Sequence, residues 1–147
     1  LRQMADRAPC PVIFVGEGDD NHLRATSVRA SFEGLQFVVD GDEFFIPICG
    51  RHHLTNALCA IAIAREIGVR SSSLAQGLSY FQQIEGRSCL KAIGPWNVID
   101  DTYNASPLAV SAACRTLGEL EMPGIGQRIA VLGDMMELGH RAADEHE

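Results

Sequence analysis

The sequence lacks a phosphate-binding loop, and basic residues are scarce. The 147 residues contain no Gly-x-x-x-x-Gly-Lys-Ser/Thr motif, and the only lysine is Lys91. The missing motif excludes from these residues the usual P-loop site, in which backbone amides and a lysine hold nucleotide phosphates. Lysine and arginine number 12 against 19 aspartates and glutamates, which gives a net charge of −7. Because nucleic-acid-binding proteins neutralise phosphates with basic side chains, we expect no nucleic-acid partner.

Long apolar segments and paired cysteines are also missing. No apolar run approaches the ~20 residues that span a bilayer, and Leu1–Asp6 lacks the apolar core of a signal peptide. The five cysteines are odd in number and scattered, with no Cys-x-x-Cys pair. We therefore predict a cytoplasmic protein with no membrane contact, whose cysteines are buried thiols rather than disulfides or zinc ligands.

The composition is that of a globular protein. Hydrophobic residues make up 46% of the chain, and 147 residues correspond to one ordinary domain or two small ones. The first part has short apolar runs separated by turn residues, which predicts strands over 11–16, 23–32, 35–39 and 44–48. Asp40-Gly41 is a hairpin signal, and Pro47 favours either the end of a strand there or a strand at the edge of the sheet. We predict an antiparallel β-meander.

The hydrophobic period then changes to that of helices. Apolar residues recur at helical spacing over 54–67, with Gly68 as a stop, and again over 74–81, where one of Ser71, Ser72 or Ser73 can act as the N-cap. These helices complete the first part of the chain.

Beyond Gly86 the pattern changes once more. It predicts a strand over 96–100, a helix capped by Ser106 with Pro107 at its first position and ended by 122–124, a strand over 128–132, and a helix from near Arg141. Strand, helix and strand in this order form a βαβ unit with a parallel sheet. We therefore predict an α/β protein in two parts, 1–86 and 87–147, which read as the end of one domain and the start of the next.

Residues 50–57 place polar side chains where the meander meets the first helix. His52 and Asn56 are four apart and share a face of that helix. An asparagine amide suits the hydrogen-bonding edge of adenine. Spacing alone favours a plainer interpretation, in which His52 caps the helix and Asn56 bonds the backbone. His52 and His53 have no carboxylate or cysteine at ligand spacing, so we expect no metal site there.

Residues 100–107 follow a predicted strand, at the position where open α/β sheets bind ligands. A carboxylate in this loop can accept hydrogen bonds from ribose hydroxyls, although a solvated turn is an equal alternative. Residues 133–139, followed by His146, also come after a predicted strand. Asp134 can cap a helix or bind a cation there, although an ordinary turn between a strand and a helix is the favoured interpretation. Arg87 can stack on a base or reach a phosphate, or it can form a surface salt bridge.

Taken in order, these segments resemble the motifs of the Mur ligase family. The matching segments are Gly50–Ala57, Gly86-Arg87, Asp100–Pro107 and Gly133–Gly139 with His146. Asp-Asp-Thr-Tyr-Asn-Ala and Gly-Asp-Met-Met-Glu-Leu-Gly favour the branch that adds D-Ala-D-Ala over other Mur ligases and over folylpolyglutamate synthases. His53 and Ser106 depart from the family pattern, which usually has asparagine at both positions.

The resemblance implies an ATP- and Mg²⁺-dependent ligase of peptidoglycan precursor synthesis. Its substrates would be a UDP-N-acetylmuramoyl-tripeptide and D-Ala-D-Ala, joined through an acyl phosphate. Residues 1–86 would be the C-terminal part of the central ATP-binding domain, and 87–147 the start of a Rossmann-like C-terminal domain. The P-loop and metal ligands would lie outside these residues, so we expect no activity from this piece alone.

The resemblance also assigns binding roles. Asn56 would face the adenine with support from His52, Arg87 would reach the nucleotide across the interdomain cleft, and Asp101 would hold the ribose. Tyr103 and Asn104 would lie near the phosphates or the second substrate. Two alternatives remain: a non-enzymatic module that binds a nucleotide or a protein, and a related amide ligase with another amino-acid specificity.

Overall fold

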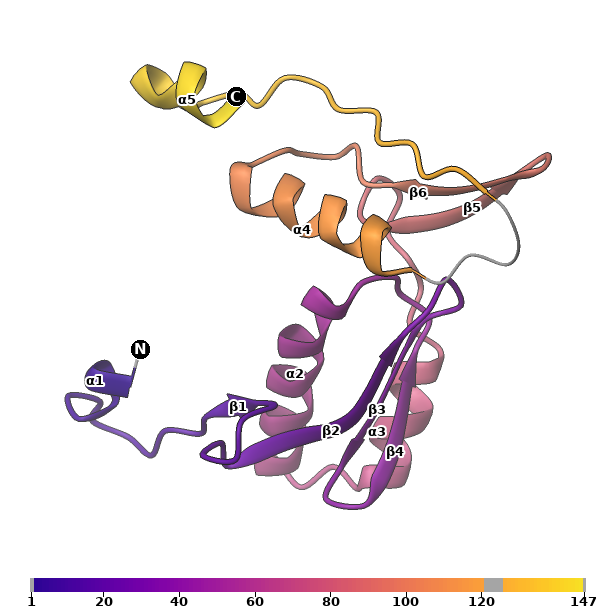
Figure 1. Cartoon of the computed structure of the whole chain (residues 1–147). Coiled ribbons are helices and arrows are strands. Elements are labelled where there is room, and N and C mark those ends of the chain that lie inside the picture. Colours follow the sequence, from indigo (N-terminus) through magenta and orange to yellow (C-terminus); the bar gives the residue numbers. More distant parts are fainter. Residues whose placement is uncertain (1, 121–125, 147) are drawn as a thin grey trace.

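The computed structural model describes residues 2–120 and 126–146. A four-stranded sheet with two helices forms the first part, and a hairpin with one long helix follows (Figure 1). The elements of the first part are α1 (Arg2–Ala5), β1 (Val15–Gly16), β2 (Leu23–Ala30), β3 (Leu35–Val39), β4 (Asp42–Ile46), the 3-10 helix η1 (Arg51–His53), α2 (Leu54–Glu66) and α3 (Ser71–Ser79). Those of the second part are β5 (Cys89–Ile93), β6 (Trp96–Asp100), α4 (Pro107–Glu119), the 3-10 helix η2 (Gly139–Arg141) and α5 (Ala142–His146).

The sheet confirms most of the predicted meander. Its strand order is β1-β2-β3-β4, and β2, β3 and β4 pair antiparallel. Asp40 and Gly41 form the β3–β4 turn with φ values of 51° and 87°, the left-handed pair that a tight hairpin needs. β4 ends before Pro47, as predicted. The first strand differs from the prediction, because β1 is two residues long and pairs parallel to β2.

The core of the protein lies between this sheet and α2. Leu35, Phe37 and Val39 alternate along β3 and are buried, and the buried face of α2 includes Leu58 and Ile61. The strand period of two and the helix period of 3.6 both point apolar side chains into one layer. The two predicted helices are confirmed, but α3 begins at Ser71 with Arg70 in the N-cap position, so no serine side chain caps it.

The second part departs further from the prediction. The sequence interpretation missed β5, which pairs antiparallel with β6. The predicted strand over 128–132 is wrong: those residues join no sheet, and Val131 is 92% exposed. A strand needs ladder partners and cover for its apolar face, and the described residues around 128–132 supply neither. The parallel βαβ pairing expected here is therefore not formed within the described residues.

The helix boundaries of the second part were predicted better. The Ser106 Oγ accepts a hydrogen bond of 3.3 Å from the Ala109 amide at the start of α4, with Pro107 in its first position. The predicted end at 122–124 lies outside the described residues. α5 begins at Ala142, close to the predicted start. None of the helices in 2–120 and 126–146 is long and apolar enough to cross a membrane.

The cysteines are free thiols, as predicted, but their burial was predicted poorly. Cys49 is fully buried, and burial raises the pKa of its thiol to about 11. Cys89 is half-buried, whereas Cys10, Cys59 and Cys114 are exposed. Scattered cysteines therefore do not by themselves indicate core positions.

Candidate functional site

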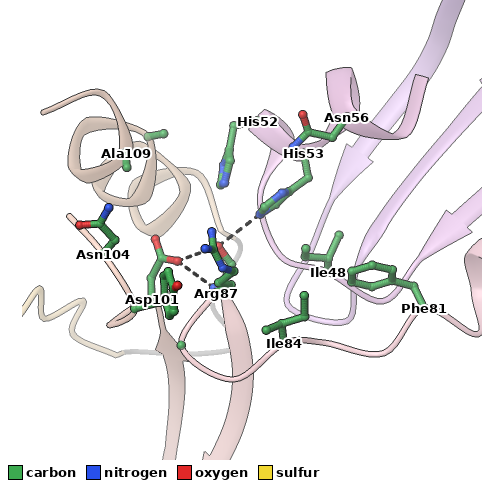
Figure 2. A pocket seen from close by; sticks show the side chains of 14 residues that line it. Ile48, His52, His53, Asn56, Phe81, Ile84, Arg87, Asp101, Asn104 and Ala109 are labelled. Atoms are coloured by element: carbon green, nitrogen blue, oxygen red, sulfur yellow. Dashed lines mark hydrogen bonds between the residues drawn. The ribbon is translucent and has the colours of Figure 1, made fainter. Parts of the chain in front are cut away.

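A cleft of about 330 Å³ lies between the start of α2 and the loop that joins β6 to α4 (Figure 2). It is at the lower end of the range for small-molecule pockets. All six residues predicted to bind ligands line it: His52, Asn56, Arg87, Asp101, Tyr103 and Asn104. Ile48, Phe81 and Ile84 add an apolar wall on the side of the sheet (Figure 2).

Two adjacent imidazoles form one edge of the cleft. The His52 and His53 rings in η1 have centroids 4.0 Å apart. Gly50 makes room for the His52 ring, since a Cβ there would lie 2.5 Å from the Cε1 of His52, and its φ of 111° also favours glycine. Burial lowers the pKa of both rings, and for His53, burial and then the neighbouring His52 lower it to about 4. Both rings are therefore neutral at pH 7.

Each imidazole bonds a side chain of the second part. The Nδ1 of His52 lies 3.3 Å from the Oγ1 of Thr116 in α4. The Nε2 of His53 lies 3.2 Å from the Oγ of Ser88. His52 makes no side-chain cap on η1 or α2, so the capping interpretation is wrong. The pair instead joins the first part of the chain to the second.

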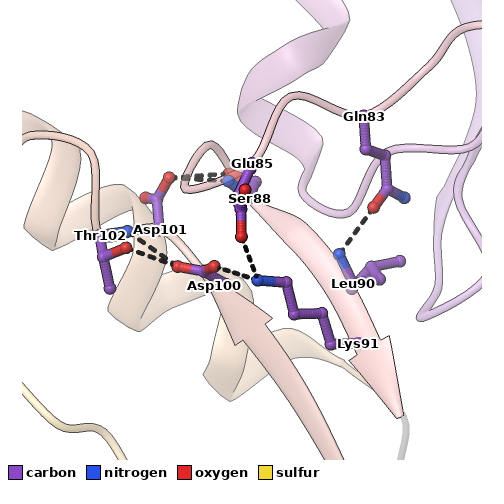
Figure 3. Close-up of polar contacts among 8 residues, drawn as sticks. All are labelled: Gln83, Glu85, Ser88, Leu90, Lys91, Asp100, Asp101 and Thr102. Carbon is purple, nitrogen blue, oxygen red and sulfur yellow. Dashed lines mark hydrogen bonds and ion pairs between the residues drawn. The ribbon is translucent and has the colours of Figure 1, made fainter.

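The two adjacent aspartates face different partners (Figure 3). The Oδ2 of Asp100 accepts a bond of 2.6 Å from Lys91, and its Oδ1 accepts one of 2.7 Å from the Thr102 hydroxyl. The Lys91 ammonium, followed by the Thr102 hydroxyl, lowers the pKa of Asp100 to about 2. Asp101 instead lines the cleft, where its Oδ1 accepts the Ser88 amide at 2.8 Å. Asp100 is thus held within the hairpin, and Asp101 is the carboxylate available to a ligand.

Arg87 and Tyr103 contact each other at the cleft. The guanidinium carbon of Arg87 lies 4.0 Å from the centre of the Tyr103 ring, within the range of a cation–π contact. The Tyr103 amide donates a bond of 2.9 Å to the Gly86 carbonyl. Gly86 has a φ of 72°, and a Cβ there would lie 3.1 Å from the Tyr103 nitrogen, so a larger residue would disturb this approach.

The side chains of the two asparagines in the cleft differ in their hydrogen bonds. The Oδ1 of Asn104 accepts a bond of 2.9 Å from the Ala105 amide and so shapes its own loop. Asn56 is exposed on α2 and lines the cleft, and no other described residue hydrogen-bonds its side chain. The backbone-bonding alternative for Asn56 is therefore wrong, and its amide can meet a ligand.

The segment 133–139 lies outside the cleft. The Nε2 of His146 accepts a bond of 2.9 Å from the Met135 amide, and its Nδ1 lies 2.7 Å from the Ala142 carbonyl. His146 thus folds the segment back onto α5. Across 2–120 and 126–146, no three His, Cys, Asp or Glu side chains gather as a metal site.

Comparison with known proteins identifies the family. Residues 86–147 match the family described as "Mur ligase, glutamate ligase domain". The chain is 38% identical over 133 residues to the UDP-N-acetylmuramoyl-tripeptide–D-alanyl-D-alanine ligase of Bacillus subtilis, a match that covers 88% of this chain and 29% of that protein. The chain belongs to the Mur ligase family. The resemblance seen in the four motifs is therefore confirmed.

Solved Mur ligase structures share this fold. A crystal structure of MurF from Acinetobacter baumannii matches with a TM-score of 0.84 and 28% identity, over 98% of this chain and 32% of that one. MurF from Thermotoga maritima in complex with ADP matches with a TM-score of 0.75 and 20% identity, over 99% of this chain and 33% of that one. The predicted α/β class is confirmed. This Mur ligase chain spans about a third of the length of these relatives.

Sequence reasoning missed several residues around this Mur ligase cleft. Ser88 and Thr116 join the two parts of the chain, yet neither falls in a motif with a recognisable spacing. Ser88 follows Gly86-Arg87 directly, which is the one signal that pointed to it. Ile48 and Phe81 belong to the apolar patterns of the predicted strand over 44–48 and the predicted helix over 74–81, which indicate core positions rather than the wall of a cleft. Ile84 belongs to neither pattern.

Proposed function

We propose that the cleft binds the adenosine part of ATP in a ligase that joins D-Ala-D-Ala to a UDP-N-acetylmuramoyl-tripeptide in the cytoplasm. The observation that carries this proposal is the gathering of Asn56, Arg87 and Asp101 around one cleft from separate segments of the chain. The names of the relatives support the reaction, and the ADP complex of the Thermotoga protein supports the nucleotide.

The lining of the cleft suits an adenosine. The apolar side chains of Ile48, Phe81 and Ile84 offer a surface for the base. The Asn56 amide has one donor and one acceptor edge, as the adenine N6 and N7 require. The Oδ2 of Asp101 can accept bonds from ribose hydroxyls, while Arg87 can stack on the base or meet a phosphate.

The rest of the reaction needs groups that these residues do not supply. ATP, when bound, supplies the phosphoryl group that activates the tripeptide carboxylate. Mg²⁺ is proposed to accompany the phosphates, but no three ligands gather among the described residues, so none is assigned to it. Tyr103 and Asn104 are proposed to face the phosphates or D-Ala-D-Ala. Residues 1–86 and 87–147 are proposed to belong to the central and C-terminal domains.

Calorimetry of the 147-residue chain with ADP and adenosine tests the nucleotide site. We expect weak binding of both, because no P-loop in this sequence holds the phosphates. Asp101→Asn and Asn56→Ala should each weaken adenosine binding about 5- to 20-fold, the effect of losing one or two hydrogen bonds. The charge-matched control Asp134→Asn, outside the cleft, should leave the affinity unchanged.

Two results would contradict the proposal. Equal losses in Asp134→Asn and Asp101→Asn would show that the binding is non-specific. No binding of either ligand, together with a defined oligomer in light scattering, would favour a protein-interaction module instead.

A further inference from the structure

The described part of the chain contains two buried polar residues, and each contacts one histidine of the pair. Ser88 is 5% exposed and Thr116 is 7% exposed. Ser88 bonds His53, and Thr116 bonds His52. Both come from the second part of the chain, whereas the histidines come from the first. Buried polar groups are costly unless they are paired, so these two contacts hold the parts in one arrangement.

The bonds at Ser88 have a definite direction. Its amide and its hydroxyl both reach the Oδ1 of Asp101, at 2.8 and 3.3 Å, and an ionised carboxylate only accepts. The single hydroxyl proton of Ser88 therefore goes to Asp101. The Ser88 Oγ must then accept at 3.2 Å from the Nε2 of His53. The resulting chain of bonds runs from His53 through Ser88 to Asp101. Figure 3 shows the bonds between Ser88 and Asp101.

We propose that Ser88 is a positioning residue, which orients the Asp101 carboxylate toward the cleft and fixes His53 as the tautomer protonated on Nε2. The role of Asp101 in this inference rests on the proposed nucleotide site. Two donors on Oδ1 hold the rotation of the carboxylate, and its Oδ2 stays free to accept ribose hydroxyls. Ser88 thus acts on the ligand through Asp101.

The backbone of Ser88 is adapted to this task. Its φ of 50° lies in the left-handed region, which is uncommon for a residue with a side chain. This conformation aims the amide and the hydroxyl of one residue at the same carboxylate oxygen. Alanine at this position would keep the amide bond and lose the hydroxyl. Glycine would lose the same hydroxyl in a conformation that it adopts easily.

His53 is a suitable partner because it is neutral. Burial and the adjacent His52 lower its pKa to about 4, so one of its two nitrogens carries a proton at pH 7 and the other does not. The bond to Ser88 selects Nε2 as the protonated one. The tautomer of His53 therefore reports whether the bond to Ser88 is formed, and it can be measured without any nucleotide.

Nitrogen-15 NMR of the imidazoles of the 147-residue chain at pH 7 tests the bond. We expect His53 to be protonated on Nε2. Ser88→Gly and Ser88→Ala should both convert it to a mixture of tautomers, and Ser79→Ala, a serine in α3 away from the cleft, should not. A His53 protonated on Nδ1, or signals that neither Ser88 variant alters, would overturn the inference.

Calorimetry with ADP tests the positioning role. Both Ser88 variants lose the hydroxyl bond that orients Asp101, and they should weaken ADP binding about fivefold, which corresponds to one net hydrogen bond. Ser79→Ala should leave the ADP affinity unchanged. Unchanged ADP affinity in both Ser88 variants, with a loss in Asp101→Asn, would overturn the positioning role alone. A wild-type chain that binds no ADP would overturn the proposed function, while the tautomer still decides whether the bond exists.

Discussion

The two parts of the chain are held together by different kinds of contact. Among the described residues, the hydrophobic core cluster consists of thirteen buried side chains between Leu23 and Ala62, and partly buried side chains of α3 pack against it. Among the described residues after 86, the buried hydrophobic residues are Leu120 and Met135. Leu108 and Val131 are 86% and 92% exposed. The first part is stabilised by apolar burial, which the second part largely lacks.

The difference shows what holds the second part in place. Gln83 donates to the Pro47 carbonyl, just after β4, at 2.6 Å. It also accepts from the Leu90 amide in β5 at 2.7 Å (Figure 3), so it ties the end of β4 to β5. The histidine pair adds the contacts to Ser88 and Thr116. These are hydrogen bonds, each worth about 1 kcal/mol net. A region held this way can open while the core stays folded, and the cleft lies on the boundary.

The largest expected effect is on the core. Phe37 is 2% exposed and stacks on Phe44 with ring centroids 5.5 Å apart. Phe37→Ala should lower the free energy of unfolding by about 3–5 kcal/mol, through lost burial and the cavity left behind. Val131→Ala in the second part should change it by less than about 0.5 kcal/mol. Urea denaturation followed by circular dichroism measures the free energy of unfolding of both variants. Similar losses in the two would contradict the proposed difference in apolar burial between the two parts.

A smaller effect is expected from acid. The pKa of His53 is lowered to about 4 in the folded chain against 6.5 for a free histidine. Between pH 4 and 6.5 the unfolded state binds more protons at His53 than the folded state does. The contribution of His53 to the free energy of unfolding is therefore fully present above pH 6.5 and is lost as the pH is lowered toward 4. His52 opposes protonation of His53 and Asp101 favours it. Since His53 is only partly buried, we expect a loss of about 1–2 kcal/mol.

Trp96 provides the measurement for this acid effect. It is the only tryptophan and lies in β6, so its fluorescence reports the second part. Unfolding monitored by Trp96 should become easier between pH 6.5 and 4, and His53→Gln should flatten that dependence. An unchanged dependence in His53→Gln would show that another group is responsible.

Local patterns predicted much of the fold. The Asp40-Gly41 turn, the stop at Gly68 and the Ser106 cap each depend on residues within a few positions, and all three are confirmed. The pair β5–β6 was accessible in the same way, because Gly94-Pro95 separates two short apolar runs. The 128–132 segment has the apolar pattern of a strand, but a pattern does not supply the neighbour that a strand must pair with.

The contacts of the site were less predictable than its residues. The resemblance of the motifs predicted Asn56, Arg87 and Asp101 as binding residues, and in the structure all three line one cleft. It assigned the ribose to Asp101, but it did not reveal that Lys91 across the hairpin holds Asp100. Nor did it reveal the bonds between His52 and Thr116, 64 residues apart, or between His53 and Ser88, 35 apart. Such bonds depend on how the two parts pack.

Amide hydrogen exchange of the chain, with and without ADP, compares the protection of its two parts directly. We expect slow exchange in β2–β4 and α2 in both conditions. We expect fast exchange in β5, β6 and the 101–106 loop without ADP, and slower exchange there when ADP is bound. Equal protection of the two parts without ADP, or an ADP effect confined to segments away from the cleft, would contradict these expectations.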